Sequence, residues 1–136
     1  MILIVASCFD KSGNNVVEGL MSGVKKMLEN SNVSYEIIRV PGANEIPVTV
    51  QHFLSKYPEK FSVAVTLGLI IKGDTDHYEM VRDSVTMGIT NLSLQYNTPI
   101  VQGVLACHVA SDAIKRKHLG QEFGKTAIEM IKIKSL

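Results

Sequence analysis

The feature that most constrains the fold is an alternation of short apolar runs with longer amphipathic stretches. The short runs are rich in β-branched side chains and apolar almost throughout. This pattern is typical of parallel strands that are covered on both faces. We predict strands at Ile2–Ala6, Tyr35–Val40, Ser62–Ile71 and Ile100–Ala106.

The stretches between these runs have the periodicity of helices. Apolar residues between Val16 and Leu28 recur at helical spacing and form one stripe. A second helix is predicted to begin near Glu45, with Pro47 in its first turn, where the missing N–H group is harmless. A third carries apolar residues between Val81 and Leu92, and the last runs from about Gln121 to Lys132.

Strand–helix alternation with short connections predicts right-handed βαβ units. The expected fold class is α/β, a flavodoxin-like three-layer α/β/α sandwich with a four-stranded parallel sheet. A chain of 136 residues, 46% of them apolar, fits one domain over residues 1–136 with a core that needs no disulfide or metal. In such sheets ligands bind beyond the carboxyl ends of the strands, so a site is expected there.

Composition and charge argue against several kinds of partner. The net charge is +1, and the longest basic cluster, Lys115–His118, is too short for a nucleic-acid arm. The opening apolar run is too short to span a membrane or act as a signal segment. Cys8 and Cys107 form no CxxC pair, so we expect reduced thiols in a cytoplasmic protein. The histidines lack metal-ligand spacing, so no metal site is expected.

The segment after the third predicted strand contains the clearest chemical signal. Gly73 lets the backbone approach a ligand closely, and the N–H groups that follow open a helix, which favours anions. Thr75 adds a hydroxyl donor. His77 lies in the first helical turn, where the helix dipole favours a neutral imidazole that can accept a proton. Phosphate beside such a histidine suggests proton transfer on a phosphorylated substrate.

A simpler interpretation explains the same residues. Gly73–Asp76 can be an ordinary capped helix start, with Asp76 and Glu79 as a capping-box-like pair and His77 as an exposed helix residue. Asp74 and Asp76 repel phosphate, so an anion site requires them to point away or to cap the helix. The local sequence by itself favours this simpler interpretation.

Other strand ends offer weaker signals. Pro41–Pro47 contains a turn and opens a helix, and a plain strand–turn–helix connection explains it equally well. Phe9 follows the first strand and could stack on a planar heterocycle, although such residues more often belong to the core. The guanidinium group of Arg116 could donate paired hydrogen bonds to a phosphate, although most surface arginines are only solvated.

Taken together, these segments resemble the lumazine synthase family, also called 6,7-dimethyl-8-ribityllumazine synthase. Pro41–Pro47 is similar to the family's PGAFEIP, and Leu67–Tyr78 is similar to LGxxIRGxTxHY. Pro99–Val104 and Ala127–Met130 extend the resemblance over nearly the whole chain. Several motifs in order and at the right spacing are far more specific than any one of them.

The resemblance implies an activity, an assembly and a set of site residues. The family condenses 5-amino-6-(D-ribitylamino)uracil with 3,4-dihydroxy-2-butanone 4-phosphate in riboflavin biosynthesis, without a cofactor, in a homopentamer with shared active sites. By position, the resemblance implies that Phe9 stacks on the pyrimidine and that His77 is catalytic. It implies that Gln102 and Arg116 come from a neighbouring subunit, where Arg116 binds the phosphate. The other implied residues are Ala43, Asn44 and Glu45 around the ribityl chain and ring, Leu69, Ile70 and Ile71 in the pyrimidine pocket, and Gly73, Asp74 and Thr75 at the phosphate.

Several positions depart from the family pattern. Asn44 and Gln102 stand where aromatic residues are usual, and Lys72 replaces the usual arginine. The two polar replacements motivate an alternative function, a non-catalytic flavin- or lumazine-binding protein on the same scaffold.

A signalling receiver domain is a second alternative, because it has the same sheet order. It would need an acidic cluster after the first strand and a phosphoacceptor Asp after the third. Here Ser7–Asp10 and Lys72–Asp74 follow those strands, so the acidic pocket is incomplete.

Overall fold

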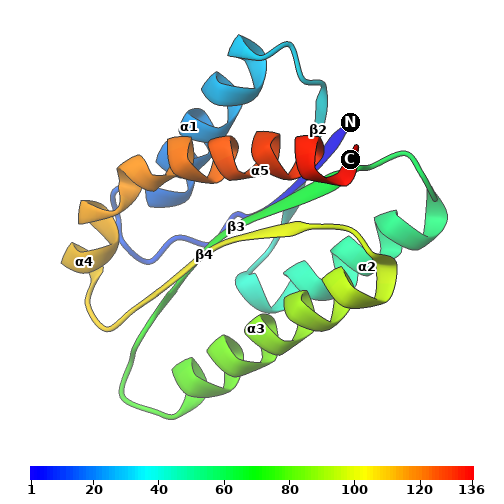
Figure 1. Cartoon of the computed structure of the whole chain (residues 1–136). Helices are drawn as coiled ribbons and strands as arrows, with labels where there is room; N and C mark the ends of the chain where they lie inside the picture. Colours follow the sequence, from blue (N-terminus) through cyan, green and yellow to red (C-terminus); the bar gives the residue numbers. More distant parts are fainter.

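A computed structural model describes residues 1–136 and has a four-stranded parallel sheet between two helix layers (Figure 1). The strands lie in the order β2-β1-β3-β4, and every neighbouring pair is parallel. Their bounds are β1 (Ile2–Ser7), β2 (Tyr35–Val40), β3 (Val63–Ile71) and β4 (Ile100–Cys107). The predicted fold class and the four predicted strands are confirmed, with small shifts at the strand ends.

The helices form one layer on each face of the sheet. One layer contains α1 (Val16–Asn30) and α5 (Gly120–Lys134), and the other contains α2 (Ile46–Lys56) and α3 (His77–Tyr96) (Figure 1). The predicted helices are confirmed. Short helices not predicted from the sequence are η1 (Ala43–Glu45), α4 (Ala110–Lys115) and η2 (Lys117–Leu119). None of the helices has the length and apolar character required to cross a membrane.

Successive residues of the central strand β1 pack into opposite layers. Ile2 and Ile4 belong to the core under α1 and α5, and Leu3 and Val5 belong to the core next to α2 and α3. All four side chains are fully buried. A strand covered on both faces has no polar side, which explains why the run is apolar without alternation.

Glycines allow α1 and α5 to cross at very short range. A Cβ atom on Gly120 would lie 2.1 Å from the carbonyl oxygen of Leu20, and a Cβ atom on Gly23 would lie 2.7 Å from the backbone nitrogen of Gln121. The obstructing atoms are backbone, which cannot rotate away. This crossing therefore depends on the absence of side chains at Gly23 and Gly120.

The order of the strands in the sheet determines where the candidate site lies. The chain adds β2 on one side of β1 and β3 on the other, so the connections leave the sheet in opposite directions at this point. Ligands of open α/β sheets bind at such a switch point, beyond the carboxyl ends of the strands. The segments that follow β1, β2 and β3 all lie at this end, because the strands are parallel.

Candidate active site

A cavity of about 340 Å³ lies at the carboxyl ends of β1, β2 and β3. This volume is in the range of small-molecule sites. The cavity brings together residues from the segments after three different strands and from the start of α3. Its lining consists of Phe9, Lys11, Gly42, Ala43, Asn44, Glu45, Leu69, Ile70, Ile71, His77, Tyr78 and Val81.

Backbone hydrogen bonds join the first two segments that line the cavity. The Cys8 N–H donates to the carbonyl oxygen of Val40 over 2.7 Å, and the Phe9 N–H donates to that of Pro41 over 2.9 Å. These bonds hold Phe9 beside the turn that leads to Ala43. The Phe9 side chain is nevertheless 56% exposed. An aromatic ring that is fixed at its backbone and open to a cavity can stack on a planar ligand.

Asp10 fixes the loop that carries Phe9. Its carboxylate accepts hydrogen bonds from the Ser12 N–H and the Val17 N–H, both at 2.9 Å, and from the Ser12 hydroxyl. Burial alone would raise the pKa of Asp10, but the hydrogen bonds from Ser12 and from backbone N–H groups outweigh it, and the pKa is lowered. An ionised Asp10 thus caps the start of α1 and holds the loop in place.

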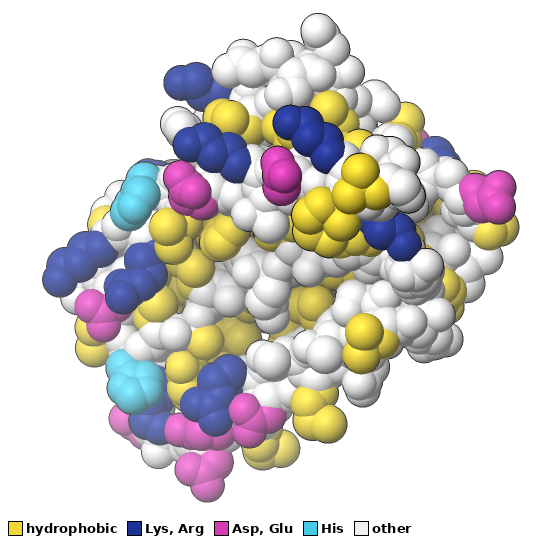
Figure 2. Space-filling model, in the orientation of Figure 1, with side chains coloured by type: hydrophobic (Ala, Val, Ile, Leu, Met, Phe, Trp, Pro, Cys, Tyr) yellow, Lys and Arg dark blue, Asp and Glu magenta, His cyan; other side chains and the backbone are white.

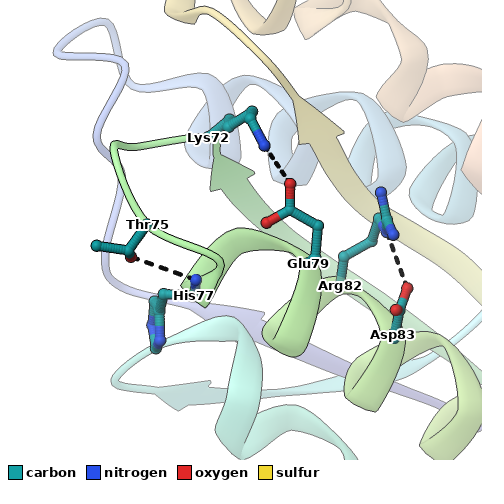
Figure 3. Close-up of polar contacts among 6 residues, drawn as sticks. All are labelled: Lys72, Thr75, His77, Glu79, Arg82 and Asp83. Carbon is teal, nitrogen blue, oxygen red and sulfur yellow. Dashed lines mark hydrogen bonds and ion pairs between the residues drawn. The ribbon is translucent and has the colours of Figure 1, made fainter.

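His77 is the first residue of α3, and its exposed side chain lines the cavity. Its backbone N–H donates to the hydroxyl oxygen of Thr75 over 3.3 Å (Figure 3). The predicted capping pair is wrong, because Asp76 makes no cap hydrogen bond and Glu79 pairs with Lys72 instead. The partner of Glu79 comes from the end of β3, which local spacing could not indicate.

The loop that precedes His77 is open to solvent. Gly73, Asp74 and Thr75 are exposed and lie next to the cavity in sequence, but they are not part of its lining. A Cβ atom on Gly73 would meet nothing within 4 Å, and the φ angle of Gly73 is not positive. The turn therefore does not require glycine, and the space over its backbone is free for a ligand.

An ion pair joins the two ends of this loop. Lys72, just after β3, pairs with Glu79 in the first turn of α3 (Figure 3). The Lys72 ammonium nitrogen also lies 5.5 Å from the ring centroid of Tyr78. The hydrogen bond from Lys72 lowers the pKa of Glu79. The second carboxylate oxygen of Glu79 is buried without a hydrogen-bond partner.

Gln102 and Arg116 lie outside the cavity that Phe9 and His77 line. The side-chain oxygen of Gln102 accepts a hydrogen bond from the Val104 N–H at 3.0 Å and lies 3.2 Å from the Thr66 hydroxyl, so it folds onto its own strand. Arg116 follows α4, donates to the Asp112 carbonyl oxygen over 2.8 Å, and lines a separate hollow of about 480 Å³ beside β4. The structure thus does not unite these two residues with His77 within one subunit.

The structure offers no evident place for a metal ion. No group of three or more His, Cys, Asp and Glu side chains is arranged to hold one. Cys8 is exposed, and Cys107 is buried. Burial raises the pKa of the Cys107 thiol, which keeps it protonated and unreactive.

Comparison with known proteins identifies the family. Residues 1–135 match the family described as 6,7-dimethyl-8-ribityllumazine synthase. The chain belongs to this family. Proteins of that name from Chlamydia pneumoniae and Leuconostoc mesenteroides subsp. mesenteroides are 39% and 38% identical to it. These alignments cover 95% and 97% of this chain, respectively, and 86% of each relative. Membership of the lumazine synthase family excludes the receiver domain.

The lumazine synthase motifs did not indicate every lining residue. Lys11 lies in a segment expected near the site only because it follows a strand, and Val81 was predicted as a core residue of a helix. Gly42 and Tyr78 belong to the motifs but have no distinctive chemistry in the sequence. Only a prediction of which helix face turns toward the strand ends could have found Val81.

Proposed function

We propose that this chain is a 6,7-dimethyl-8-ribityllumazine synthase, condensing 5-amino-6-(D-ribitylamino)uracil with 3,4-dihydroxy-2-butanone 4-phosphate without a cofactor. Family membership over residues 1–135 carries this proposal. The cavity supports it, because a stacking ring, Phe9, and a group that can transfer protons, His77, face the same space at the switch point.

The cavity residues suggest how the reaction proceeds. The pyrimidine stacks on Phe9 with its edge toward Leu69–Ile71, and the segment Ala43–Glu45 offers polar groups to the ribityl chain. The free amine attacks the ketone and expels water to form an imine. Elimination then releases phosphate, and ring closure expels a second water. His77 accepts and returns the protons, while the positioning of two reactants contributes on the order of 7–11 kcal/mol to the acceleration.

We propose that the phosphate is held jointly by two subunits of a homopentamer. Near the phosphate, the loop Gly73–Thr75 supplies backbone N–H groups but no basic side chain, and Asp74 is acidic. Arg116 is exposed beside β4, far along the chain from this loop, and is free to contact another copy. Figure 2 shows hydrophobic side chains in the band between α5 and α3, where β4 forms the edge of the sheet. Such an uncovered apolar edge is typical of subunit contacts.

Turnover distinguishes this function from a non-catalytic binding protein. The purified chain is mixed with both substrates, and lumazine absorbance and released phosphate are followed together. We expect one phosphate for each lumazine formed. Binding of the lumazine without any turnover would instead favour the binding protein that Asn44 and Gln102 suggest. A cytoplasmic location stays a prediction from the sequence, and cell fractionation tests it.

A further inference from the structure

Lys11 is the single Lys or Arg among the residues that line the cavity. Its ammonium nitrogen lies 5.6 Å from the centroid of the Phe9 ring, within the range of cation–π contacts. Lys11 forms no ion pair, since it is absent from all five salt bridges of the chain. The ammonium group of Lys11 therefore faces the cavity without a direct ion-pair partner, although the carboxylate of Glu45 belongs to the same lining.

The loop around Lys11 is held in place. Asp10 on one side accepts hydrogen bonds from Ser12 and from the start of α1, and the Ser12 hydroxyl oxygen in turn accepts one from the Asn14 N–H at 3.1 Å. Lys11 lies between these anchored residues. Its backbone position is fixed while its long side chain remains exposed and can move.

A planar ring that stacks on the face of Phe9 that Lys11 approaches displaces the ammonium group from that face. A planar ring stacked on Phe9 leaves its outer face open unless another group covers it. Asn44 lines the cavity but is not aromatic, and Gln102 lies outside it with its side chain bound to its own strand. Tyr78 is 5% exposed, and the cationic groups of Lys72 and Arg82 lie 5.5 and 5.4 Å from its ring centroid, so its ring is not free to cover a ligand.

We propose that Lys11 folds over the outer face of the pyrimidine stacked on Phe9 and is a specificity-determining residue for this substrate. The inference rests on the proposed function. A pyrimidinedione with amino substituents is electron-rich and bears carbonyl oxygens, and both features attract an ammonium group. Lys11 thus favours an electron-rich ring and disfavours a cationic one.

The test compares Lys11→Met, Lys11→Arg and the wild-type protein in steady-state kinetics with each substrate varied in turn. Methionine keeps most of the length and removes the charge. For Lys11→Met we expect KM for the ribitylamino-pyrimidine to rise roughly 2- to 30-fold, the span of cation–π contacts. KM for the butanone phosphate should be nearly unchanged, and Lys11→Arg should restore most of the loss. Lys26→Met, a change at an exposed lysine of α1, is the matched control.

Other outcomes would overturn either the role of Lys11 or the proposed function. An unchanged KM for the pyrimidine in Lys11→Met overturns the inference, and so does a rise only in KM for the butanone phosphate, which would assign Lys11 to phosphate. Wild-type protein without turnover defeats the proposed function instead. In that case a fluorescence titration with the lumazine still compares wild type and Lys11→Met, and equal affinity overturns the role of Lys11. If Lys11→Met is misfolded by circular dichroism, Lys11→Gln replaces it.

Discussion

At the scale of single residues, His77 combines exposure with a fixed backbone. Its N–H is held by Thr75, and its side chain reaches the same cavity as Phe9. A side chain at a helix start can contact a ligand bound beyond the strand ends, because both lie at the same edge of the sheet. We therefore assign proton transfer to His77 in the proposed reaction.

We expect His77→Gln to lower kcat by about 10²- to 10⁴-fold, the usual contribution of general acid–base catalysis. Glutamine keeps the size and polarity of the side chain but cannot accept a proton at neutral pH. Binding of the lumazine product should survive, since Phe9 and the segment Ala43–Glu45 are unaltered. Stopped-flow turnover and a fluorescence titration measure the two quantities. His52→Gln, at an exposed position of α2, is the control, and full activity of His77→Gln would exclude the proton-transfer role.

The hydrogen bonds to Asp10 predict how the free energy of unfolding depends on pH. Removing its carboxylate in Asp10→Ala leaves the Val17 N–H and Ser12 N–H unpaired, and we expect the free energy of unfolding to fall by about 1–2 kcal/mol at pH 7. The pKa of Asp10 is lowered from its ordinary value of 3.8, so the contribution of the ionised group is complete above that pH. It is lost as the pH falls through the pKa in the folded state.

Urea unfolding of wild type and Asp10→Ala at several pH values measures this contribution. The difference in free energy of unfolding should be constant near neutral pH and shrink below about pH 4. A difference that grows on acidification would contradict the assignment.

At the scale of elements, the close crossing of α1 and α5 predicts that a side chain at Gly120 destabilises the fold. In a helix interior, Gly→Ala improves helix propensity by about 1 kcal/mol, and Gly120, as the first residue of α5, gains at most this much. In this structure the new Cβ would lie 2.1 Å from the carbonyl oxygen of Leu20, so the helices must separate. We expect a net loss of about 1–3 kcal/mol, because overpacking against backbone cannot be relieved by a rotamer change.

Gly19→Ala is the matched control on α1. The three atoms nearest to its Cβ would all belong to the side chain of Lys117, which can rotate away at the loss of one hydrogen bond to Asn14. Thermal unfolding of both variants should show a clearly larger decrease in Tm for Gly120→Ala. Equal decreases would mean that the backbone contact does not limit the crossing.

At the scale of the whole molecule, the proposed shared site predicts complementation between defective subunits. His77 and Arg116 line different hollows of one subunit, so each site would combine His77 of one copy with Arg116 of the next. We expect Arg116→Ala to lower activity on the order of 10²-fold by weakening the hold on phosphate. A mixture of Arg116→Ala and His77→Gln, unfolded and refolded together, should recover about one quarter of the wild-type activity.

That fraction follows from random assembly, in which half of the subunits supply an intact His77 and half supply an intact Arg116. The two variants refolded separately and then combined are the control, and they should stay inactive while subunits do not exchange. Light scattering of the wild type gives the number of subunits. A monomer, or co-refolded mixtures without activity, would refute the shared site.

The fold was largely predictable because its signals are local. Each strand is apolar on both faces, and each helix has its own stripe, so periodicity alone indicated the layers and the sheet. The short helix α4 was missed because six residues from Ala110 to Lys115 contain too little periodicity. The Asp76–Glu79 capping pair was predicted wrongly because Lys72 competes for Glu79 through a tertiary contact.

The sequence by itself determined the fold class, the family and the segments that end at the strand termini, since these depend on patterns within short stretches of chain. Only the tertiary structure decided which of these segments share a cavity. It placed Lys11 beside Phe9, bound Gln102 to its own strand, and separated Arg116 from His77. Such relations depend on how strand register and helix packing orient side chains from distant segments, and no local pattern encodes that orientation.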